Sequence, residues 1–341
     1  MKDIRAVAPN LKRRLSGVTA TIARLVPLMD GVVATGPGLP EGTPHIPVWR
    51  AMLMPRDRWR VWHARRNTEM LLGLFLCHIL RRRYKLIFTS ASQRSRTGYT
   101  KWLMGNMDAI VATCQKTASV VHLPSRVILH GVNTRVFYPA PDRTEAKRKL
   151  GLPEGDIYVG CFGRIRPQKG TDVFVDAMIA ACKADRRLRG VIIGRATEKH
   201  VEYQKRLDAK IRNAGLHHRI RFVPEVPMDA VADWYRAMDL FIAPNRLGEG
   251  FGLTVLEAMA CAVPVIATRV GAFEELVVPG ETGALVDQDD TNAIIASVND
   301  IVGGNLEAYQ EAAVAHVRKN FPLEREASEL LALYEELLGN A

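Results

Sequence analysis

The second half of the chain alternates short apolar runs with longer amphipathic stretches. The stretches at residues 171–184 and 198–214 carry apolar side chains at three- and four-residue spacing, which predicts helices. The apolar runs between such stretches are four to six residues long, which predicts buried strands. These strands are expected at residues 158–163, 190–194, 220–224, 240–244, 263–268 and 283–286. Because strands that alternate with helices form parallel sheets covered on both faces, we predict a doubly wound α/β domain here.

The first half repeats this rhythm less regularly, and we predict a second Rossmann-like domain there. Its strands are expected at residues 4–8, 31–35, 60–63, 85–89, 109–112 and 126–129. Prolines and glycines interrupt the pattern over residues 137–155, so we place a linker at residues 141–156. A chain of 341 residues is long enough for two domains. We therefore expect two doubly wound domains, at residues 1–140 and 157–304, that face each other across a cleft.

Residues 305–341 are expected to be helical by the same spacing criterion. The pair Phe321-Pro322 should break this helical segment, because proline lacks an N–H and disfavours a helical conformation in the residue before it. We expect the last helix to pack back toward the N-terminal domain.

No segment has the pattern of a membrane span or a secretory signal. The longest apolar stretch, residues 70–80, is interrupted by Gly73 and His78 and falls well short of the roughly 20 residues that cross a bilayer. Residues 1–14 hold a basic cluster without an apolar core and cleavage site. The five cysteines follow neither a disulfide framework nor a zinc-ligand spacing. We therefore expect a cytoplasmic protein with reduced thiols.

Charge is distributed unevenly along the chain. Residues 1–155 hold 26 of the 47 Lys and Arg but 9 of the 36 Asp and Glu, a net charge of +17, whereas the remainder carries −6. The cations cluster at residues 12–14, 56–66, 81–85 and 94–96. The high positive charge of residues 1–155 predicts an anionic partner, which could be a nucleic acid, a phospholipid or a phosphorylated substrate. The alternative is a surface that is merely well solvated.

The sequence GCFGRIRPQKG at residues 160–170 lies at the end of a predicted strand and before a predicted helix. Ligands of α/β sheets bind at this end of the strands. Gly163 allows the backbone to approach a ligand closely, and Arg164 and Lys169 offer two cations for a pyrophosphate. The alternative for this motif is a turn whose cations face water.

A second motif, PNRLGEGFGLTVLEAMA at residues 244–260, repeats the order of strand, glycine-rich loop and helix. Backbone N–H groups at the start of that helix would bind an anion together with the helix dipole. Glu249 falls in the loop and Glu257 in the helix, so the two carboxylates can bind different hydroxyl groups of one ligand. The alternative is that Glu249 caps the helix and Glu257 is a surface residue.

These two motifs resemble the signature of the retaining GT-B glycosyltransferases of family GT4, the glycosyl transferases group 1. The resemblance covers residues 126–290 closely, including ILHGVNTRVFYP at 128–139 and PGETG at 279–283. The N-terminal half matches more loosely. Its segments KRRLSGVT, VWHARRN and FTSASQR, with NFPLEREAS near the C-terminus, are similar to those of bacterial lipopolysaccharide-core mannosyltransferases.

The resemblance implies a role for each matching residue. Arg164 and Lys169 would neutralise the donor diphosphate, and Glu249 would bind donor-sugar hydroxyls near the anomeric carbon. The resemblance further implies that Glu257 holds the ribose and that residues 222–226 border the base. Backbone contacts to the donor are implied for Gly17, Gly163, Gly250, Phe251, Gly252 and Leu253.

One position departs from the family pattern. Many members have a histidine after a strand, in a Thr-x-His sequence, where this chain reads Thr89-Ser90-Ala91. The role could pass to residues 92–94 or to His63, which stands at the end of the strand predicted at residues 60–63. His63 is therefore a candidate catalytic residue, with a purely structural role as the alternative. The cations Arg65, Arg66 and Arg94 are candidates for binding the acceptor.

The family resemblance implies a retaining, metal-independent transfer of a hexose. The most favoured reaction moves mannose from GDP-mannose, a substrate rather than a cofactor, to a lipopolysaccharide-core or other lipid-linked saccharide. The only Asp-x-Asp sequence, at residues 287–289, is expected to be a turn, so no metal site is predicted. The basic first domain predicts peripheral binding to the anionic inner face of the cytoplasmic membrane.

Other functions stay open at this stage. A UDP- or ADP-sugar could be the donor, the chain could be an epimerase on the same fold, or it could bind a sugar nucleotide without turnover. A nucleic-acid partner is disfavoured, because no recognition motif is present and aromatic residues are not interleaved with the basic clusters.

Overall fold

The computed structural model describes residues 4–13, 17–227, 230–247 and 249–339. It divides into two compact units: Met1–Gly131 with Leu323–Ala341, and Val132–Pro322. Arg14, Ser16 and Gly248, which belong to the motifs above, lie outside the described residues.

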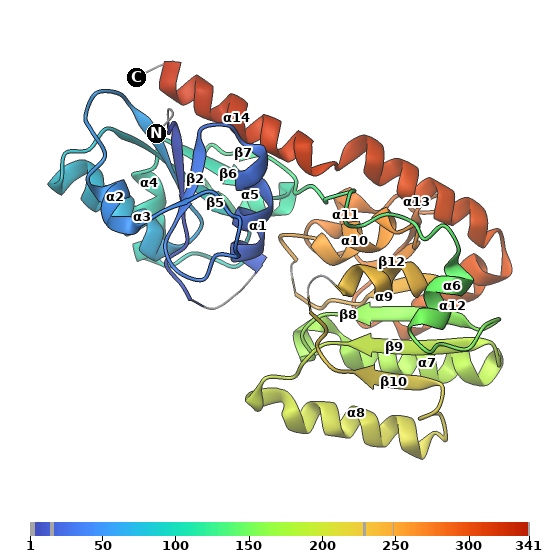
Figure 1. The fold of residues 1–341 in the computed structure, drawn as a ribbon. Helices are drawn as coiled ribbons and strands as arrows, with labels where there is room; N and C mark the ends of the chain where they lie inside the picture. Colours follow the sequence, from blue (N-terminus) through green and yellow to red (C-terminus); the bar gives the residue numbers. More distant parts are fainter. Residues whose placement is uncertain (1–3, 14–16, 228–229, 248, 340–341) are drawn as a thin grey trace. The chain divides into compact units, whose positions relative to one another are not determined.

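The first unit contains a seven-stranded parallel sheet with the strand order β3-β2-β1-β4-β5-β6-β7 (Figure 1). Its strands are β1 (Ala6–Pro9), β2 (Val32–Thr35), β3 (His45–Ile46), β4 (Arg60–Ala64), β5 (Tyr84–Ser90), β6 (Ala109–Ala112) and β7 (Arg126–Val127). Six of the seven match predicted strands. The sequence analysis missed β3, because its two residues lie between Pro44 and Pro47 and are too few to show an alternating pattern.

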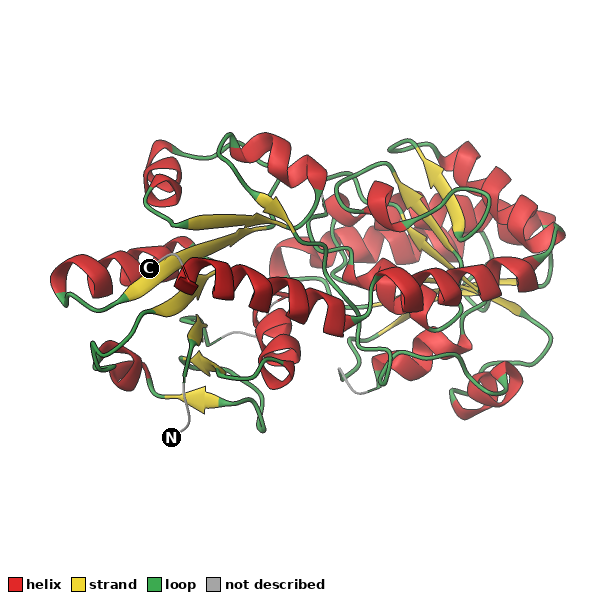
Figure 2. Ribbon diagram, turned by 90° about the horizontal axis from the view of Figure 1, so that it is seen from above, coloured by secondary structure: helices red, strands yellow, loops and turns green. Residues whose placement is uncertain are grey.

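Helices cover both faces of this sheet (Figure 2). Successive strand residues point to opposite faces, so Ala6 and Ala8 of β1 enter one core cluster and Val7 enters the other. On the first face lie α1 (Gly17–Leu25), η1 (Val26–Leu28) and α14 (Leu323–Gly339). On the second face lie α2 (Val48–Met52), α3 (Asn67–Leu74), η2 (Phe75–Ile79), α4 (Gly98–Gly105) and α5 (Gln115–Val121).

The second unit contains a six-stranded parallel sheet with the order β10-β9-β8-β11-β12-β13. Its strands are β8 (Ile157–Phe162), β9 (Leu188–Ile193), β10 (Ile220–Val223), β11 (Leu240–Ala243), β12 (Val265–Thr268) and β13 (Gly283–Val286). All six were predicted, and α7 (Thr171–Ala184) has the predicted bounds. The prediction of two doubly wound parallel sheets is therefore confirmed.

The remaining helices of the second unit follow its strands. They are α6 (Arg143–Lys149), η3 (Pro167–Lys169), η4 (Glu198–His200), α8 (Val201–Asn213), α9 (Val231–Ala237), α10 (Leu253–Ala260), α11 (Phe273–Leu276), α12 (Thr291–Gly303) and α13 (Leu306–Asn320). Residues 141–156, expected as a linker, contain α6 and belong to this unit.

The C-terminal helical segment is interrupted on either side of Pro322, as the sequence predicts. α13 ends at Asn320 and α14 begins at Leu323. α14 is fixed to the first unit at its start, where Glu326 accepts hydrogen bonds from the Gly131 N–H at 2.8 Å and lies 2.6 Å from His130 Nδ1. The side chains of His130 and Glu326 are both buried, so their contact indicates a structural role for His130.

None of the helices in the described part of the chain combines the length and apolar character that crossing a bilayer requires. The five cysteines are free thiols, and all except Cys77 are buried.

Candidate functional site

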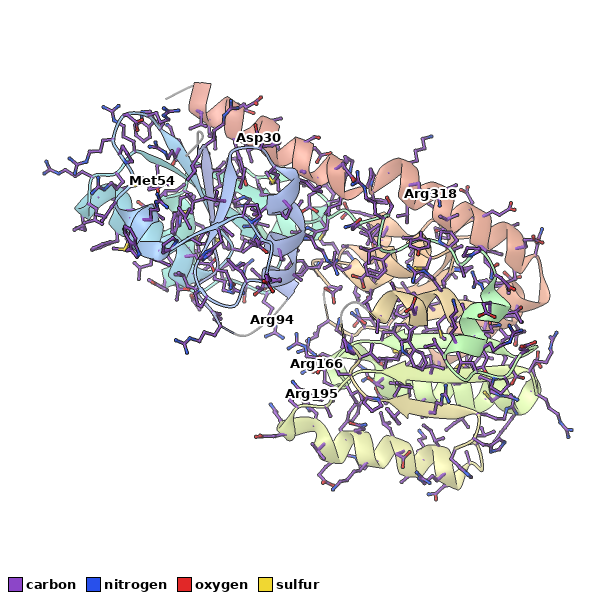
Figure 3. The ribbon with its side chains drawn as sticks, in the orientation of Figure 1. Asp30, Met54, Arg94, Arg166, Arg195 and Arg318 are labelled. Atoms are coloured by element: carbon purple, nitrogen blue, oxygen red, sulfur yellow. The ribbon has the colours of Figure 1, made fainter. Side chains whose placement is uncertain are left out.

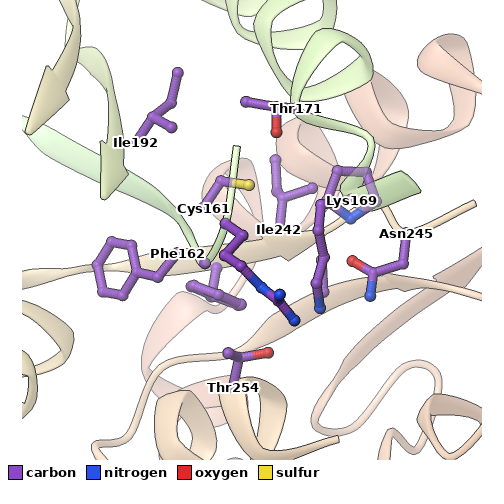
Figure 4. A pocket seen from close by; sticks show the side chains of 13 residues that line it. Cys161, Phe162, Lys169, Thr171, Ile192, Ile242, Asn245 and Thr254 are labelled. Atoms are coloured by element: carbon purple, nitrogen blue, oxygen red, sulfur yellow. The ribbon is translucent and has the colours of Figure 1, made fainter. Parts of the chain in front are cut away.

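A pocket opens in the second unit at the point where the strand order reverses. The strands that follow β8 in the chain, β9 and β10, lie on one side of it, whereas β11, β12 and β13 lie on the other side. The strand order therefore reverses between β8 and β11, and α/β sheets bind ligands at such a point. Both glycine-rich motifs contribute to this pocket, and Figure 4 shows Lys169, Asn245 and Thr254 around it. Its polar lining comes mainly from Gly163, Arg164, Lys169, Asn245 and Thr254.

Glycines allow the two motifs to pack closely together. Gly170 has a φ of +66°, and a Cβ there would lie 1.7 Å from the Pro244 carbonyl oxygen. A Cβ on Gly194 would lie 1.9 Å from the carbonyl oxygen of Gly163. Because Gly170 has no side chain, the turn that carries Lys169 can lie directly against the loop that follows β11. Gly194, which follows β9, likewise lets its loop lie directly against Gly163.

Arg246 joins the two motifs through its side chain. Its Nη1 and Nη2 donate to the two carboxylate oxygens of Asp172, each at 2.8 Å, and Nη1 also donates to the Pro167 carbonyl at 2.9 Å. Its Nε donates to Asp289. Burial raises the pKa of Asp172, but hydrogen bonds from Arg246 and Tyr203 outweigh this effect and lower it. The sequence analysis did not identify this clamp.

Lys169, which lines the pocket, forms an ion pair with Glu249. The distance from Lys169 Nζ to Glu249 Oε2 is 2.6 Å, and each side chain is 20% exposed. Asn245 Nδ2 donates to the same oxygen at 3.4 Å, and the Phe251 N–H donates to Oε1 at 3.3 Å. Burial raises the pKa of Glu249, but the charge and hydrogen bond of Lys169 lower it below its ordinary value. Glu249 is therefore an ionised, fixed group.

Arg164 is the less constrained cation of the site. Its side chain is exposed and lines the pocket, and within the described ranges it has no hydrogen-bond or ion-pair partner. A guanidinium in this state can bind an anionic ligand without first breaking an internal contact. Figure 3 shows Arg166 and Arg195 projecting from loops at the same end of this sheet.

The loop before α10 presents backbone N–H groups. Gly252 is the N-cap of the helix with a φ of +63°, and a Cβ there would lie 2.3 Å from Leu276 Cδ1. The glycine therefore lets the chain turn into the helix at Leu253. Gly252 and Leu253 supply N–H groups that have no acceptors within the helix and favour an anion. Gly250 and Phe251 precede them in the loop, where the Phe251 N–H donates to Glu249.

Glu257 lies in the second turn of α10, where it is 7% exposed. The Tyr235 hydroxyl donates to its Oε2 at 3.3 Å. The alternative that Glu257 is a surface residue is therefore wrong. Residues 222–226, expected to border a base, begin in β10 with Phe222 packed at the edge of the core.

The first unit has a polar network at the corresponding position of its own sheet, between β1 and β4. Arg66 Nη1 donates to Asn10 Oδ1 at 2.8 Å and to Glu69 Oε1 at 2.7 Å. Thr19 Oγ1 donates to the same Asn10 oxygen at 3.1 Å, and the Arg65 N–H donates to Glu69 Oε2 at 2.8 Å. Asn10 and Glu69 are fully buried.

This network was not predicted, although Asn10 directly follows a strand and could have been noticed there. Gly17 lies beside it as the first residue of α1, and a Cβ on Gly17 would meet no described atom within 4 Å.

His63 lies in the interior of the first unit. It is fully buried, with Nδ1 at 2.6 Å from the Tyr334 hydroxyl and Nε2 at 2.6 Å from Thr89 Oγ1. Burial and the nearby charge of Arg65 lower the pKa of His63 well below its ordinary value. Both ring nitrogens are occupied, so this geometry speaks against the expected catalytic role and favours the structural alternative.

The three cations expected to bind an acceptor differ in their surroundings. Arg66 is held in the network described above, and Arg65 Nη1 donates to the His63 carbonyl at 3.3 Å. Arg94 is exposed and extends from the surface of the first unit (Figure 3). Beside Ala91, where the family histidine is missing, Arg96 donates to Ser90 Oγ and to the Ser92 carbonyl.

The Asp-x-Asp sequence makes ion pairs with arginines. Asp289, with a φ of +62°, accepts from Arg246, and Asp287 lies 3.7 Å from Arg269. The described residues include no group of three or more His, Cys, Asp or Glu that could hold a metal ion.

Comparison with known proteins identifies the family. The model of the glycosyl transferases group 1 matches residues 142–315. The lipopolysaccharide core biosynthesis mannosyltransferase LpsB of Rhizobium meliloti (strain 1021) is 46% identical, over 99% of this chain and 99% of that protein. LpcC of Rhizobium leguminosarum bv. viciae, which has the same descriptive name, is 46% identical over 100% of this chain and 98% of its own length.

A solved structure supports the fold independently. The crystal structure of Anabaena Alr3699/HepE in complex with UDP and glucose matches with a TM-score of 0.84, covering 98% of this chain and 100% of that one at 18% identity. The GT-B fold that the resemblance implied is confirmed. Full-length similarity and the family match agree, and the chain belongs to the group 1 glycosyl transferases.

Proposed function

We propose that this protein transfers mannose from GDP-mannose to a lipopolysaccharide-core acceptor, with retention of configuration and without a metal ion. The observation that carries the proposal is the 46% identity, over almost the whole chain, to LpsB and LpcC, both described as lipopolysaccharide core biosynthesis mannosyltransferases. The pocket between the two glycine-rich motifs supports the same proposal, because its cations and N–H groups suit a diphosphate.

The chemistry requires stabilisation of the leaving group. As the glycosidic bond to phosphate breaks, negative charge grows on the departing diphosphate, and fixed positive groups that meet this charge lower the barrier. Arg164 would bind the diphosphate as a free cation, and Lys169 would share its charge between the diphosphate and Glu249. Backbone N–H groups of Gly250, Phe251, Gly252 and Leu253 would complete the site.

Glu249 acts in this proposal as a positioning group for donor-sugar hydroxyls. Its contacts with Lys169 and Asn245 hold the carboxylate in place, and the charge and hydrogen bond of Lys169 reduce its basicity, which suits a hydrogen-bond acceptor better than a nucleophile. Glu257, held by Tyr235, would accept from the ribose hydroxyls. Gly163 and Gly17 would pass close to the phosphates because they lack side chains.

The first unit would bind the acceptor. Its positive charge suits a phosphorylated saccharide, and Arg94 is the exposed candidate for direct contact. Arg65 and Arg66 would contribute positive charge to acceptor binding from their positions at the edge of the buried Asn10–Glu69 network. We place the reaction at the inner face of the cytoplasmic membrane, where each cation near an anionic surface contributes about 1 kcal/mol of attraction.

Product formation tests this function with GDP-mannose, UDP-glucose, UDP-galactose and ADP-heptose as donors, a crude lipopolysaccharide-core acceptor and excess EDTA. We expect transfer from GDP-mannose, unchanged by EDTA because the leaving group is stabilised by Arg164, Lys169 and backbone N–H groups. Transfer only from another donor would reject the mannosyl assignment, and loss in EDTA that added metal restores would reject the metal-free mechanism. NMR of the donor separates transfer from epimerisation.

Replacing Arg246 with lysine should weaken donor binding. A lysine cannot bond both oxygens of Asp172 together with Pro167 and Asp289, so the turn that carries Lys169 loses its main side-chain restraint. We expect kcat/KM for the donor to fall about tenfold, mainly through KM, because one lost charge-assisted contact is worth about 1.5 kcal/mol or more. Steady-state kinetics check this result, with Arg269→Lys as the matched control.

A further inference from the structure

Large apolar side chains are exposed on the helices that cover the second face of the sheet in the first unit. They have relative exposures between 39% and 67%, whereas such residues are usually buried. We call this set the outer apolar face: Trp49 and Leu53 at α2, Leu71, Phe75 and Ile79 along α3 and η2, and Tyr99 and Trp102 on α4.

These side chains belong to one surface because their helices share one core. α2, α3 and α4 bury Ala51, Met70 and Leu103 in the same cluster against the sheet, so their opposite sides point away from it. Hydrogen bonds join the neighbouring segments: Arg82 Nη1 donates to the Met54 carbonyl at 3.1 Å, and Asn67 Nδ2 donates to Thr100 Oγ1 at 2.8 Å. Figure 1 shows α2, α3 and α4 next to one another.

The segment that carries this face is strongly cationic. Residues 48–108 contain 13 Lys and Arg but three Asp and Glu. One of the three, Glu69, is fully buried, and another, Asp57, is paired with Arg58 and Arg60. The third, Asp108, is exposed and lies 3.7 Å from Lys85. Exposed cations therefore outnumber exposed anions beside the outer apolar face, and they include Arg56, Arg81, Arg83 and Lys101.

We propose that the outer apolar face inserts into the interface of an anionic lipid bilayer. Apolar and aromatic side chains beside Lys and Arg are the pattern of surfaces that lie in the headgroup region, where tryptophan and tyrosine are favoured. A second copy of this chain is a poorer occupant, because pairing the face with itself would bring two cationic segments together. The proposal deepens the membrane location given above, since it adds apolar insertion to electrostatic attraction.

Binding to vesicles tests the proposal. We expect the full-length protein to sediment with vesicles of phosphatidylethanolamine and phosphatidylglycerol, and to keep part of this binding in high salt, because insertion of apolar surface is not screened. The double variant Trp49→Ser/Ile79→Ser should bind at least about tenfold more weakly, since it removes two large apolar side chains that would otherwise leave water on insertion. Leu28→Ser is the matched control, because Leu28 is 39% exposed in η1 on the other face of the same sheet.

Fluorescence quenching tests insertion directly and does not depend on the amount of protein that sediments with the vesicles. Lipids with brominated acyl chains should quench the emission of the wild-type protein and quench Trp49→Phe/Trp102→Phe clearly less. Binding that high salt abolishes completely, equal binding of the double variant and Leu28→Ser, or a dimer that Trp49→Ser/Ile79→Ser dissolves would each overturn the proposal.

Transfer to a detergent-dispersed acceptor distinguishes this proposal from the proposed function. The double variant should retain wild-type transfer there, because Trp49 and Ile79 belong to no substrate site. If no donor supports transfer by the wild type but insertion into vesicles is observed, the proposed function is wrong and the proposal that the outer apolar face inserts into a membrane is still supported.

Discussion

Replacing Lys169 with alanine should lower kcat/KM for glycosyl transfer by on the order of a hundredfold to a thousandfold, the usual cost of removing one group that stabilises developing charge. The substitution removes a cation from the pocket and leaves the Glu249 carboxylate, only 20% exposed, without its ion-pair partner. An unpaired anion at this place would then repel the donor diphosphate. Steady-state kinetics with GDP-mannose measure the effect, and Lys199→Ala, a change in η4 of the same unit, is the control.

A double-mutant cycle separates the roles of the two charges. If Glu249 mainly positions the donor and orients Lys169, Lys169→Ala/Glu249→Ala should lose less activity than the two single variants together, because each single change already breaks the same pair. Glu249→Gln should keep measurable transfer, since an amide oxygen still accepts a hydrogen bond. Strict additivity, together with complete loss in Glu249→Gln, would instead favour a chemical role for the carboxylate.

Replacing Glu69 with alanine should destabilise the first unit by about 3–5 kcal/mol, the usual cost of removing one partner of a buried ion pair. Glu69 is fully buried and accepts hydrogen bonds from Arg66 Nη1 and from the Arg65 N–H. Its removal takes away the carboxylate of the Arg66 ion pair, while neutral acceptors such as Asn10 and Thr19 remain, and it leaves the Arg65 N–H without its acceptor. Glu69→Gln should cost less, because it retains one acceptor oxygen.

Hydrogen exchange of amides in β1 and β4 measures this loss in the first unit directly, which matters because two units need not unfold together. Glu41→Ala is the control, since Glu41 is exposed in the same unit. A change in opening free energy below about 1 kcal/mol, the size typical of an exposed pair, would show that the network does not hold the unit together.

Local sequence patterns determined the architecture and the place of the donor pocket. Strand and helix periods are local properties, so the six strands of the second unit and the bounds of α7 could be predicted from side-chain spacing. The glycine-rich motifs could also be recognised from the sequence, because positions such as Gly170 and Gly252 have positive φ values that other residues rarely adopt. Parallel sheets then bring such motifs to one edge, which is why Lys169 and Glu249 could be assigned to one site before their contact was known.

Only the tertiary structure decided how individual side chains are used. His63 lies near the end of β4 and precedes two arginines, yet the hydroxyl of Tyr334, 271 residues away, occupies its Nδ1. Arg246 and Asp172 are 74 residues apart and form the clamp between the motifs. The sequence determined which elements form and in what order, because these depend on local periodicity. Partners of buried polar groups depend on which strands become neighbours and how their helices pack, and no local pattern encodes those distances.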